Sequence, residues 1–388
     1  MRAIKILGFF FLISFAGFGQ INWQPTLAEA FKQAKVENKL VLVECFHPQC
    51  SHCISLNQNL DDPEIQRVLN EKYINYRIDI SNRIQYQELK DRNISLIQWP
   101  VFLVFNKEDS LTNYVEPTEL LASLKLQLAN VEFSSDLKCD RVGIEEPNID
   151  LLSKCGVYYR MTQNIEKNNE MANYLYFWLN QENIGSEKSW MVYKKSVSSS
   201  DNLLAQFWLQ NLSLATQYEK SENVVKEIMA AQLQTKMISL YKSDKLTPQD
   251  VVTLKEELTK IGADETKILS FTWNLELITL IKSGDFKNAK ILCNKVVNQF
   301  PTPGAFITVF RLINDQMNTS ELNSFFEENI EVLTQKAVKN QELSKELLLQ
   351  SARFYSKANN LKACRESLQK AAELGFNQQQ EFEEKYCR

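Results

Sequence analysis

Three of the chain's cysteines and both of its histidines lie close together, in the segment ECFHPQCSHC that runs from Glu44 to Cys53. If this segment enters a helix, Cys50 and Cys53 lie one turn apart on the same face. The free N–H groups and the positive dipole end at the start of a helix stabilise a thiolate there. The spacing therefore favours thiol–disulfide exchange, with Cys50 as the nucleophile and Cys53 as the resolving thiol.

The same segment also contains the ligand types that zinc prefers. They are Cys45, His47, Cys50, His52 and Cys53. A structural zinc site needs four converging ligands, usually with a second cysteine or histidine cluster elsewhere. The sequence shows no such second cluster, so disulfide exchange is the preferred interpretation, with no metal and no bound cofactor.

The elements around the cysteine pair predict an α/β layout. An apolar strand at residues 40–46 leads into the pair, and residues 51–60 have the apolar spacing of a helix. Thr26 and Glu29 form a candidate capping box, and Asp62 caps a further helix. In order, we predict helices at 25–39, 51–60, 63–73, 82–93 and 117–131, and strands at 40–46, 74–80, 100–106 and 110–115. This order predicts a mixed sheet flanked by helices.

Cys50-Ser51-His52-Cys53 at a strand-to-helix junction, followed by ELKDRNISLIQWPVFLVFN with Pro100 opening a strand, resembles the thioredoxin fold. The segment NLDDPEIQRVLNEKYINYRIDI is similar in particular to exported bacterial thioredoxin-like proteins related to the C-terminal domain of the transmembrane disulfide reductase. The resemblance covers about residues 22–133. It implies an α/β thioredoxin fold and disulfide exchange on protein thiols or disulfides, together with a redox partner protein.

The resemblance also implies roles for residues outside the pair. Glu44 matches the position of a buried acid in thioredoxins, where burial would raise its pKa and let it accept the proton of Cys53. The alternative is an edge carboxylate with access to water, because burying a charge is costly. Pro100 matches the fold's cis-proline, although the sequence does not encode its isomer. Trp99 would line the substrate groove or pack in the core.

The residues beside the two cysteines depart from the general thioredoxin pattern, which has Trp before the pair and Gly-Pro inside it. Gln49, Ser51 and His52 stand there instead, and we assign Gln49 and Ser51 to the substrate groove. His52, protonated or donating a hydrogen bond, favours a thiolate on Cys50 and a more oxidising pair. Disulfide-donating relatives also carry His there, which tilts the direction toward an oxidase or isomerase, but reductases occur among the relatives too.

Two other residues of the opening segment have simpler expected roles. Cys45 should point to the opposite face of its strand from Glu44, as a small buried packing residue. His47 lies in the loop before the pair, where it either tunes the thiolate or is simply solvated; solvation is the preferred interpretation.

The N-terminal segment MRAIKILGFFFLISFAGFGQ predicts a cleaved secretory signal at residues 1–19. Two basic residues precede an apolar run, and Gly17 and Gly19 are the small residues that a signal peptidase recognises. The run is shorter than the roughly 20 apolar residues of a spanning helix. We therefore expect a periplasmic or secreted protein with no membrane span in the mature chain, a location where cysteines are usually paired, catalytic or metal-bound.

Composition bounds the remaining function classes. The chain of 388 residues exceeds the usual single-domain size, so two domains are expected. The low content of helix-breaking residues, 10 Gly and 9 Pro, favours long helices. The 44 basic and 48 acidic residues are spread along the chain with a net charge of −4, which argues against nucleic-acid binding.

From about residue 148 onward, helical periodicity recurs almost throughout. The segments SGDFKNAKILCNKVVNQFP and KANNLKACRESLQKAAELGF match the second half of a tetratricopeptide repeat in a degenerate form, so a helical repeat and a non-repeat bundle both stay open. The concave face of a repeat array would bind a peptide or a partner protein.

The remaining cysteines suggest structural disulfides. Cys139 and Cys155 flank a segment that would join the two domains, and Cys364 and Cys387 could tie down the C-terminus. Cys293 is left as a buried packing residue. Sequence alone does not define the pairing.

We therefore predict a signal at residues 1–19, a thioredoxin-like domain at 20–135, a linker at 136–160 and an all-α repeat or bundle domain at 161–388. The predicted function is an exported thiol–disulfide oxidoreductase. The alternative is a non-enzymatic binding protein whose thioredoxin-like domain holds a structural disulfide. Substrates, direction of electron flow, redox partner and oligomeric state are not encoded in any motif.

Overall fold

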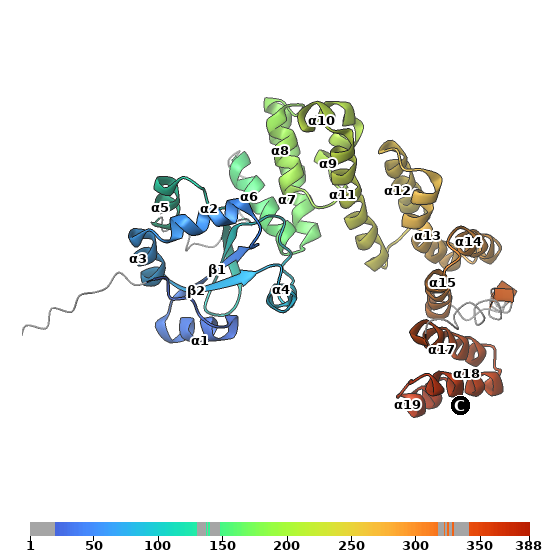
Figure 1. Ribbon diagram of the computed structural model, residues 1–388. Helices are drawn as coiled ribbons and strands as arrows, with labels where there is room; N and C mark the ends of the chain where they lie inside the picture. Colours follow the sequence, from blue (N-terminus) through green and yellow to red (C-terminus); the bar gives the residue numbers. More distant parts are fainter. Residues whose placement is uncertain are drawn as a thin grey trace, which may run out of the picture. The chain divides into compact units, whose positions relative to one another are not determined.

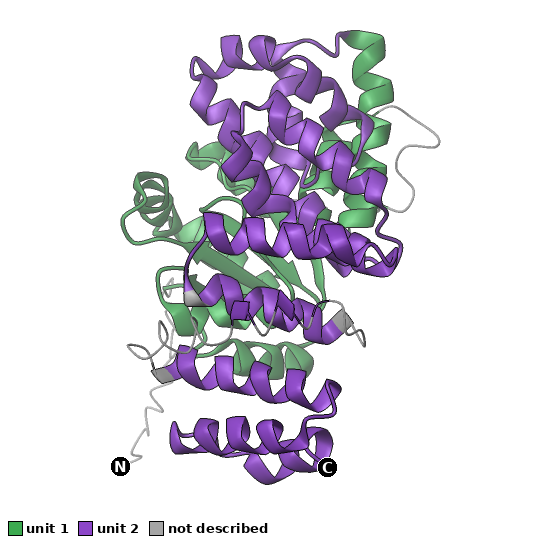
Figure 2. Cartoon of the chain, turned by 90° about the vertical axis from the view of Figure 1, so that its right-hand side faces the viewer, with its two compact units in different colours: residues 1–182 green, residues 183–388 purple. Residues whose placement is uncertain are grey.

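The computed structural model describes residues 20–129, 137, 139, 148–316, 322, 324–325, 328–329 and 341–388. The chain divides into two compact units, residues 1–182 and residues 183–388 (Figure 2). The predicted signal at residues 1–19 lies outside the described residues.

Unit 1 contains a small sheet with helices packed on it (Figure 1). Its elements are α1 (Leu27–Glu37), β1 (Leu40–Phe46), α2 (Ser51–Leu60), α3 (Pro63–Lys72), β2 (Tyr73–Asp79), α4 (Arg83–Lys90), β3 (Val101–Phe105), β4 (Leu111–Val115), α5 (Leu121–Ala129), α6 (Ile149–Met161) and α7 (Ile165–Glu182). The order of elements through α5 is the predicted one.

The four strands are arranged in the order β2-β1-β3-β4. Strand β1 pairs with β2 in parallel and with β3 antiparallel, and β3 pairs antiparallel with β4. The sheet is therefore mixed, as predicted. In this register Glu44 of β1 is the direct neighbour of Arg77 on β2 and of Phe102 on β3.

The two faces of the sheet are covered by different helices. One apolar cluster joins β1 through Val41, Val43 and Cys45 to buried side chains of α1 and α6. The other joins β1 through Leu42 to buried side chains of α2, α3 and α5. Because side chains alternate along a strand, Glu44 shares the face of Leu42 and lies under α2.

Helix α6 is an integral part of unit 1. Its Val157 and Met161 belong to the apolar cluster that also contains α1. Tyr158 donates a hydrogen bond to the Leu111 carbonyl at 2.8 Å, and the Ser95 amide donates to the Met161 carbonyl at 2.8 Å. Much of the region predicted as a linker, residues 136–160, is thus a packed helix, and the compact unit extends to Glu182.

Helix caps follow the predicted signals with one difference. Asp62 caps α3, and its carboxylate accepts from two amides of the first turn. The Thr26 hydroxyl accepts from the Glu29 amide at 3.1 Å, as a capping box requires. The Glu29 carboxylate, however, lies 3.3 Å from the ammonium of Lys32, so this interaction takes the place of the predicted return bond to the Thr26 backbone.

The described secondary structure of unit 2 consists of helices joined by short turns and loops. Its helices are α8 (Glu187–Ser196), α9 (Leu203–Gln210), α10 (Leu212–Glu219), α11 (Glu222–Lys242), α12 (Pro248–Lys260), α13 (Glu265–Lys282), α14 (Phe286–Gln299), α15 (Pro303–Gln316), α17 (Gln341–Lys357), α18 (Leu361–Glu373) and α19 (Gln379–Tyr386). Consecutive helices pack on one another, as α13 does on α14 and α17 on α18. Across the described ranges of both units, no helix is long and apolar enough to cross a membrane.

Candidate redox site

The loop between β1 and α2 places Cys50 at the very start of a helix. Cys50 is the N-cap of α2, and its sulfur accepts a hydrogen bond from the Cys53 amide at 3.2 Å. Its side chain is partly exposed. An N-cap sulfur beside free amides is where the helix dipole favours a thiolate, so Cys50 has the location that a nucleophile needs.

Cys53 lies one turn further and is buried, with 1% of its surface exposed. Burial, its hydrogen bond with Cys50 and the nearby Glu44 charge together raise the pKa of the Cys53 thiol to about 12, although a hydrogen bond with the His47 backbone acts in the opposite direction. Cys50 and Cys53 are both free thiols here. Cys53 therefore needs a proton acceptor before it can attack a disulfide.

Glu44 is completely buried beneath α2. Burial raises the pKa of its carboxyl to about 7, although the charge of Arg77 and a hydrogen bond from it act in the opposite direction. The sequence left open whether this residue would be buried or at an edge, and the structure places it in the interior. A carboxyl with a pKa near neutrality can both accept and release a proton under physiological conditions.

Arg77 is the partner of Glu44, and sequence analysis did not identify it. Its Nη2 donates to Glu44 Oε1 at 3.3 Å and to Asn57 Oδ1 at 2.6 Å. The guanidinium lies 4.5 Å from the centre of the Phe46 ring and 5.1 Å from that of Trp23. The available signal was an arginine in the predicted strand next to the strand of Glu44, but only the strand register places the two side by side.

A second loop lies against the segment before the cysteines. The Trp99–Pro100 peptide bond is cis. The Trp99 ring, 44% exposed, stacks on the His47 ring with centroids 6.3 Å apart. The His47 carbonyl in turn accepts from the Cys50 amide at 3.1 Å. Trp99 therefore extends an exposed aromatic surface from the cis-proline loop to the cysteine loop, and His47 contacts it instead of being merely solvated.

The two residues between the cysteines are exposed, and one of them has an unpredicted partner. His52 Nδ1 contacts the carboxylate of Glu119, which lies just before α5. The Glu119 carbonyl accepts from the Asn59 side chain at 2.8 Å, so this loop is held against α2 at two points. Ser51 and Gln49 are exposed beside Cys50.

The remaining cysteines separate into a buried thiol in each unit and two disulfides. Burial raises the pKa of Cys45, on the opposite sheet face from Glu44, and raises that of Cys293 to about 12. The disulfides are Cys139–Cys155 and Cys364–Cys387, the two pairs named from the sequence. Among the residues with described positions, no cluster of three or more Cys, His, Asp or Glu side chains is arranged to hold a metal ion.

Comparison with known families agrees with this fold. Residues 14–115 match the model of a family described as Thioredox_DsbH, a protein of unknown function, DUF255. The match is to a thioredoxin-like family and includes β1 to β4, the cysteine pair and Pro100. No curated protein matches the chain. The N-terminal region is thus thioredoxin-like in both fold and sequence.

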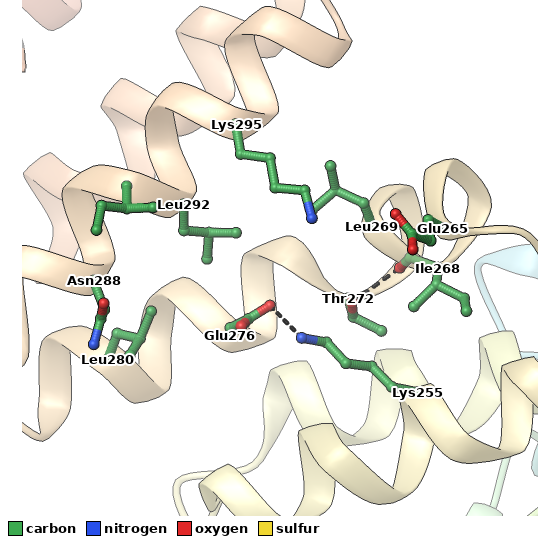
Figure 3. A pocket seen from close by; sticks show the side chains of 11 residues that line it. Lys255, Glu265, Ile268, Leu269, Thr272, Glu276, Leu280, Asn288, Leu292 and Lys295 are labelled. Carbon is green, nitrogen blue, oxygen red and sulfur yellow. Dashed lines mark hydrogen bonds and ion pairs between the residues drawn. The ribbon is translucent and has the colours of Figure 1, made fainter.

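Unit 2 contains a separate pocket between α12, α13 and α14, with a volume of about 470 Å³ (Figure 3). Its walls are partly apolar, with Ile268, Leu269 and Leu292 among the lining residues. Lys255 and Glu276 form an ion pair across it at 2.6 Å. Figure 3 shows the Lys295 side chain extending into the same space from α14.

Proposed function

We propose that unit 1 is a thiol–disulfide oxidoreductase that acts on protein thiols or disulfides. One observation carries the proposal. A completely buried carboxyl with a pKa of about 7, Glu44, lies beneath a cysteine pair of which one member caps a helix and the other is buried with a pKa of about 12. A structural disulfide needs no acid of this kind below it.

In the direction of substrate reduction, the Cys50 thiolate attacks a substrate disulfide, forms a mixed disulfide and releases one substrate sulfur as a thiolate, which takes a proton from water. Cys53 then passes its proton to the Glu44 carboxylate and attacks Cys50. The Cys50–Cys53 bond forms, the second substrate sulfur leaves, and two electrons have moved from the pair to the substrate. The reverse sequence oxidises a substrate dithiol.

Supporting groups complete the site in this proposal. Trp99 and the cis-proline loop provide a surface for the substrate chain, with Gln49 and Ser51 at its edge. His52 tunes the poise of Cys50, and a redox partner protein returns the pair to its starting state. We further propose that the protein works after export, in the periplasm or outside the cell, on the evidence of the predicted signal and the two disulfides.

The reduction potential of the Cys50/Cys53 pair tests the proposal. The full mature chain would be equilibrated in a glutathione series, and a Cys53→Ala variant would be screened for trapped mixed disulfides, with Cys50→Ala/Cys53→Ala as the matched control. An oxidising potential with trapped partners indicates a disulfide donor or isomerase, and a strongly negative one indicates a reductase. No titration of the pair and no trapping above the control would rule out the enzyme.

A second candidate function belongs to unit 2, because its pocket between α12, α13 and α14 combines apolar walls with charged rims. We propose that this tetratricopeptide-like region binds a polypeptide segment and so recruits a partner or substrate. Ile291, an exposed apolar residue of the rim, offers the test. Ile291→Glu should abolish partner capture by a Cys53→Ala bait, whereas Ile84→Glu, at a more exposed apolar site in unit 1, should not. Equal capture by both variants would rule this pocket out.

A further inference from the structure

A second pocket, of about 260 Å³, lies in unit 1 next to Arg77. Its polar lining comes from Gln20, Asn57, Asp61, Gln66 and Arg77. A water molecule occupies about 30 Å³ and needs two to four polar partners to be held in a protein. The pocket has the room and the hydrogen-bonding groups for a small cluster of water molecules.

Arg77 connects this pocket to the buried carboxyl of Glu44. Its Nη2 lies 3.3 Å from Glu44 Oε1 and 2.6 Å from Asn57 Oδ1, and both Arg77 and Asn57 line the pocket. The Arg77 side chain is 29% exposed, whereas Glu44 is 0% exposed. The guanidinium therefore extends from the interior, where the carboxyl is, to a space that solvent can reach.

One oxygen of the Glu44 carboxyl is left without a hydrogen bond. Glu44 Oε2 and Arg77 Nε form an ion pair at 2.9 Å, and both atoms are buried without a hydrogen-bond partner among the described residues. The titratable and charged groups around the carboxyl are Arg77 on β2, Cys53 on α2 and Cys45 on its own strand. Oε2 is thus open to carry a proton while Oε1 keeps its bond to Arg77.

We propose that the pocket beside Arg77 is the route by which Glu44 exchanges its proton with solvent, with Arg77 and Asn57 as positioning residues at its inner end. The proposal rests on the proposed role of Glu44 as the base. After the Cys53 proton has moved to Glu44 and the Cys50–Cys53 bond has formed, the carboxyl gives this proton to pocket water and returns to the carboxylate. In this proposal the substrate sulfur has left Cys50 by then, but the substrate chain still lies over the cysteines, so a separate exit lets Glu44 lose its proton before the substrate departs.

Carbon-13 NMR of the full chain labelled at glutamate carboxyls provides the test. The Glu44 signal is identified by its absence in Glu44→Gln, and near its pKa both protonation states are populated. Fast exchange through the pocket should give one averaged signal in the wild type. Gln66→Phe fills the pocket from α3 and should broaden or split this signal, whereas Gln87→Phe, the same change on α4 outside the pocket, should leave it averaged. An averaged signal in folded Gln66→Phe would overturn the proposal.

A second measurement does not depend on how well the variants fold. In the wild type, added imidazole is small enough to enter and should sharpen the Glu44 signal, whereas a bulky buffer of similar pKa at equal concentration should not. Equal sharpening by both would overturn the pocket route. Neither measurement requires redox turnover, so the result stays separate from the glutathione titration that tests the proposed function itself.

Discussion

Among the described residues, each unit buries one glutamate, and the two carboxyls have very different surroundings. Glu257 in unit 2 is 1% exposed, and the ammonium of Lys236 lies 3.0 Å from both of its oxygens. Gln206 donates to it at 2.6 Å, and Ser200 lies within 3.5 Å. Glu44 in unit 1 has one hydrogen bond, at 3.3 Å, and its other oxygen has an ion pair with Arg77 Nε at 2.9 Å but no hydrogen bond among the described residues.

The difference shows how surroundings assign a role to a buried carboxyl. Several donors compensate the desolvation of Glu257, so its carboxylate joins α11 to α12 as a structural group. Glu44 is compensated only in part, and its pKa stays raised to about 7. Burial that a single arginine compensates only in part is what holds the pKa of this carboxyl near neutrality.

The largest expected effect tests whether the ion pair of Glu257 with Lys236 stabilises unit 2. Lys236→Met should destabilise unit 2 by about 3 to 5 kcal/mol, because it leaves the Glu257 carboxylate buried without its cation. Chemical denaturation followed by tryptophan fluorescence of Trp190 and Trp208, both fully buried in unit 2, measures the loss. Lys236→Met/Glu257→Met should recover much of it. A cost below about 1 kcal/mol for the single variant would contradict the structural role.

The next effect concerns the pH dependence of stability. In the folded protein Glu44 has a pKa of about 7, whereas its ordinary value, expected in the unfolded chain, is 4.5. The folded protein therefore binds this proton more tightly. The contribution of the bound proton to the free energy of unfolding is complete below pH 4.5 and is lost as pH rises through 7, for a total of about 3 kcal/mol. Urea unfolding of the wild type and of Glu44→Gln between pH 4.5 and 8 should show this decline in the wild type alone. Parallel curves would contradict the raised pKa.

A smaller effect is expected from the partner of Glu44. Arg77→Met removes the charge and the hydrogen bond that lower the Glu44 pKa, which should therefore rise above 7 by about one unit. Because the Glu44 carboxyl becomes neutral by taking up a proton when Arg77 is removed, the loss of stability of Arg77→Met at pH 6 should be well below that of Lys236→Met. Carbon-13 titration of the Glu44 carboxyl measures the shift, with Arg92→Met as the control for losing a similarly exposed arginine that does not contact Glu44. An unchanged Glu44 pKa in Arg77→Met would mean that Arg77 does not lower the pKa of this carboxyl.

The smallest effect is expected at an exposed carboxylate. Glu119 contacts His52, but both side chains are at least half exposed, at 51% and 69%. Water screens such a pair, so Glu119→Gln should change stability by less than about 1 kcal/mol. The corresponding change in the reduction potential of the cysteine pair should stay within about 20 mV. A shift above about 30 mV would show that His52 controls the poise through Glu119.

Local patterns account for what was predicted correctly in unit 1. The strand at 40–46, the helix that begins at the cysteine pair and the Asp62 cap all depend on residues close in sequence. The family resemblance identified Glu44 as a candidate buried acid, and both disulfide pairs were named from their positions. The helical nature of unit 2 followed from its periodicity.

Residues far apart in sequence account for what was missed. Arg77, Asn57 and Glu119 become partners of the site only through strand register and helix packing. The extent of unit 1 was also missed, because helix α6 looks like any other amphipathic segment until its Met161 carbonyl accepts from the Ser95 amide.

The sequence by itself predicted the chemistry that we propose for this protein, since a Cys-x-x-Cys pair entering a helix supplies a candidate nucleophile and a candidate resolving thiol. The tertiary structure alone decided the surroundings of Glu44, the proposed proton acceptor. How deeply Glu44 is buried, and that one arginine from the neighbouring strand compensates it only in part, are consequences of packing between segments more than thirty residues apart. A pKa depends on the total field and solvent access at one point, and no local pattern of residues encodes these.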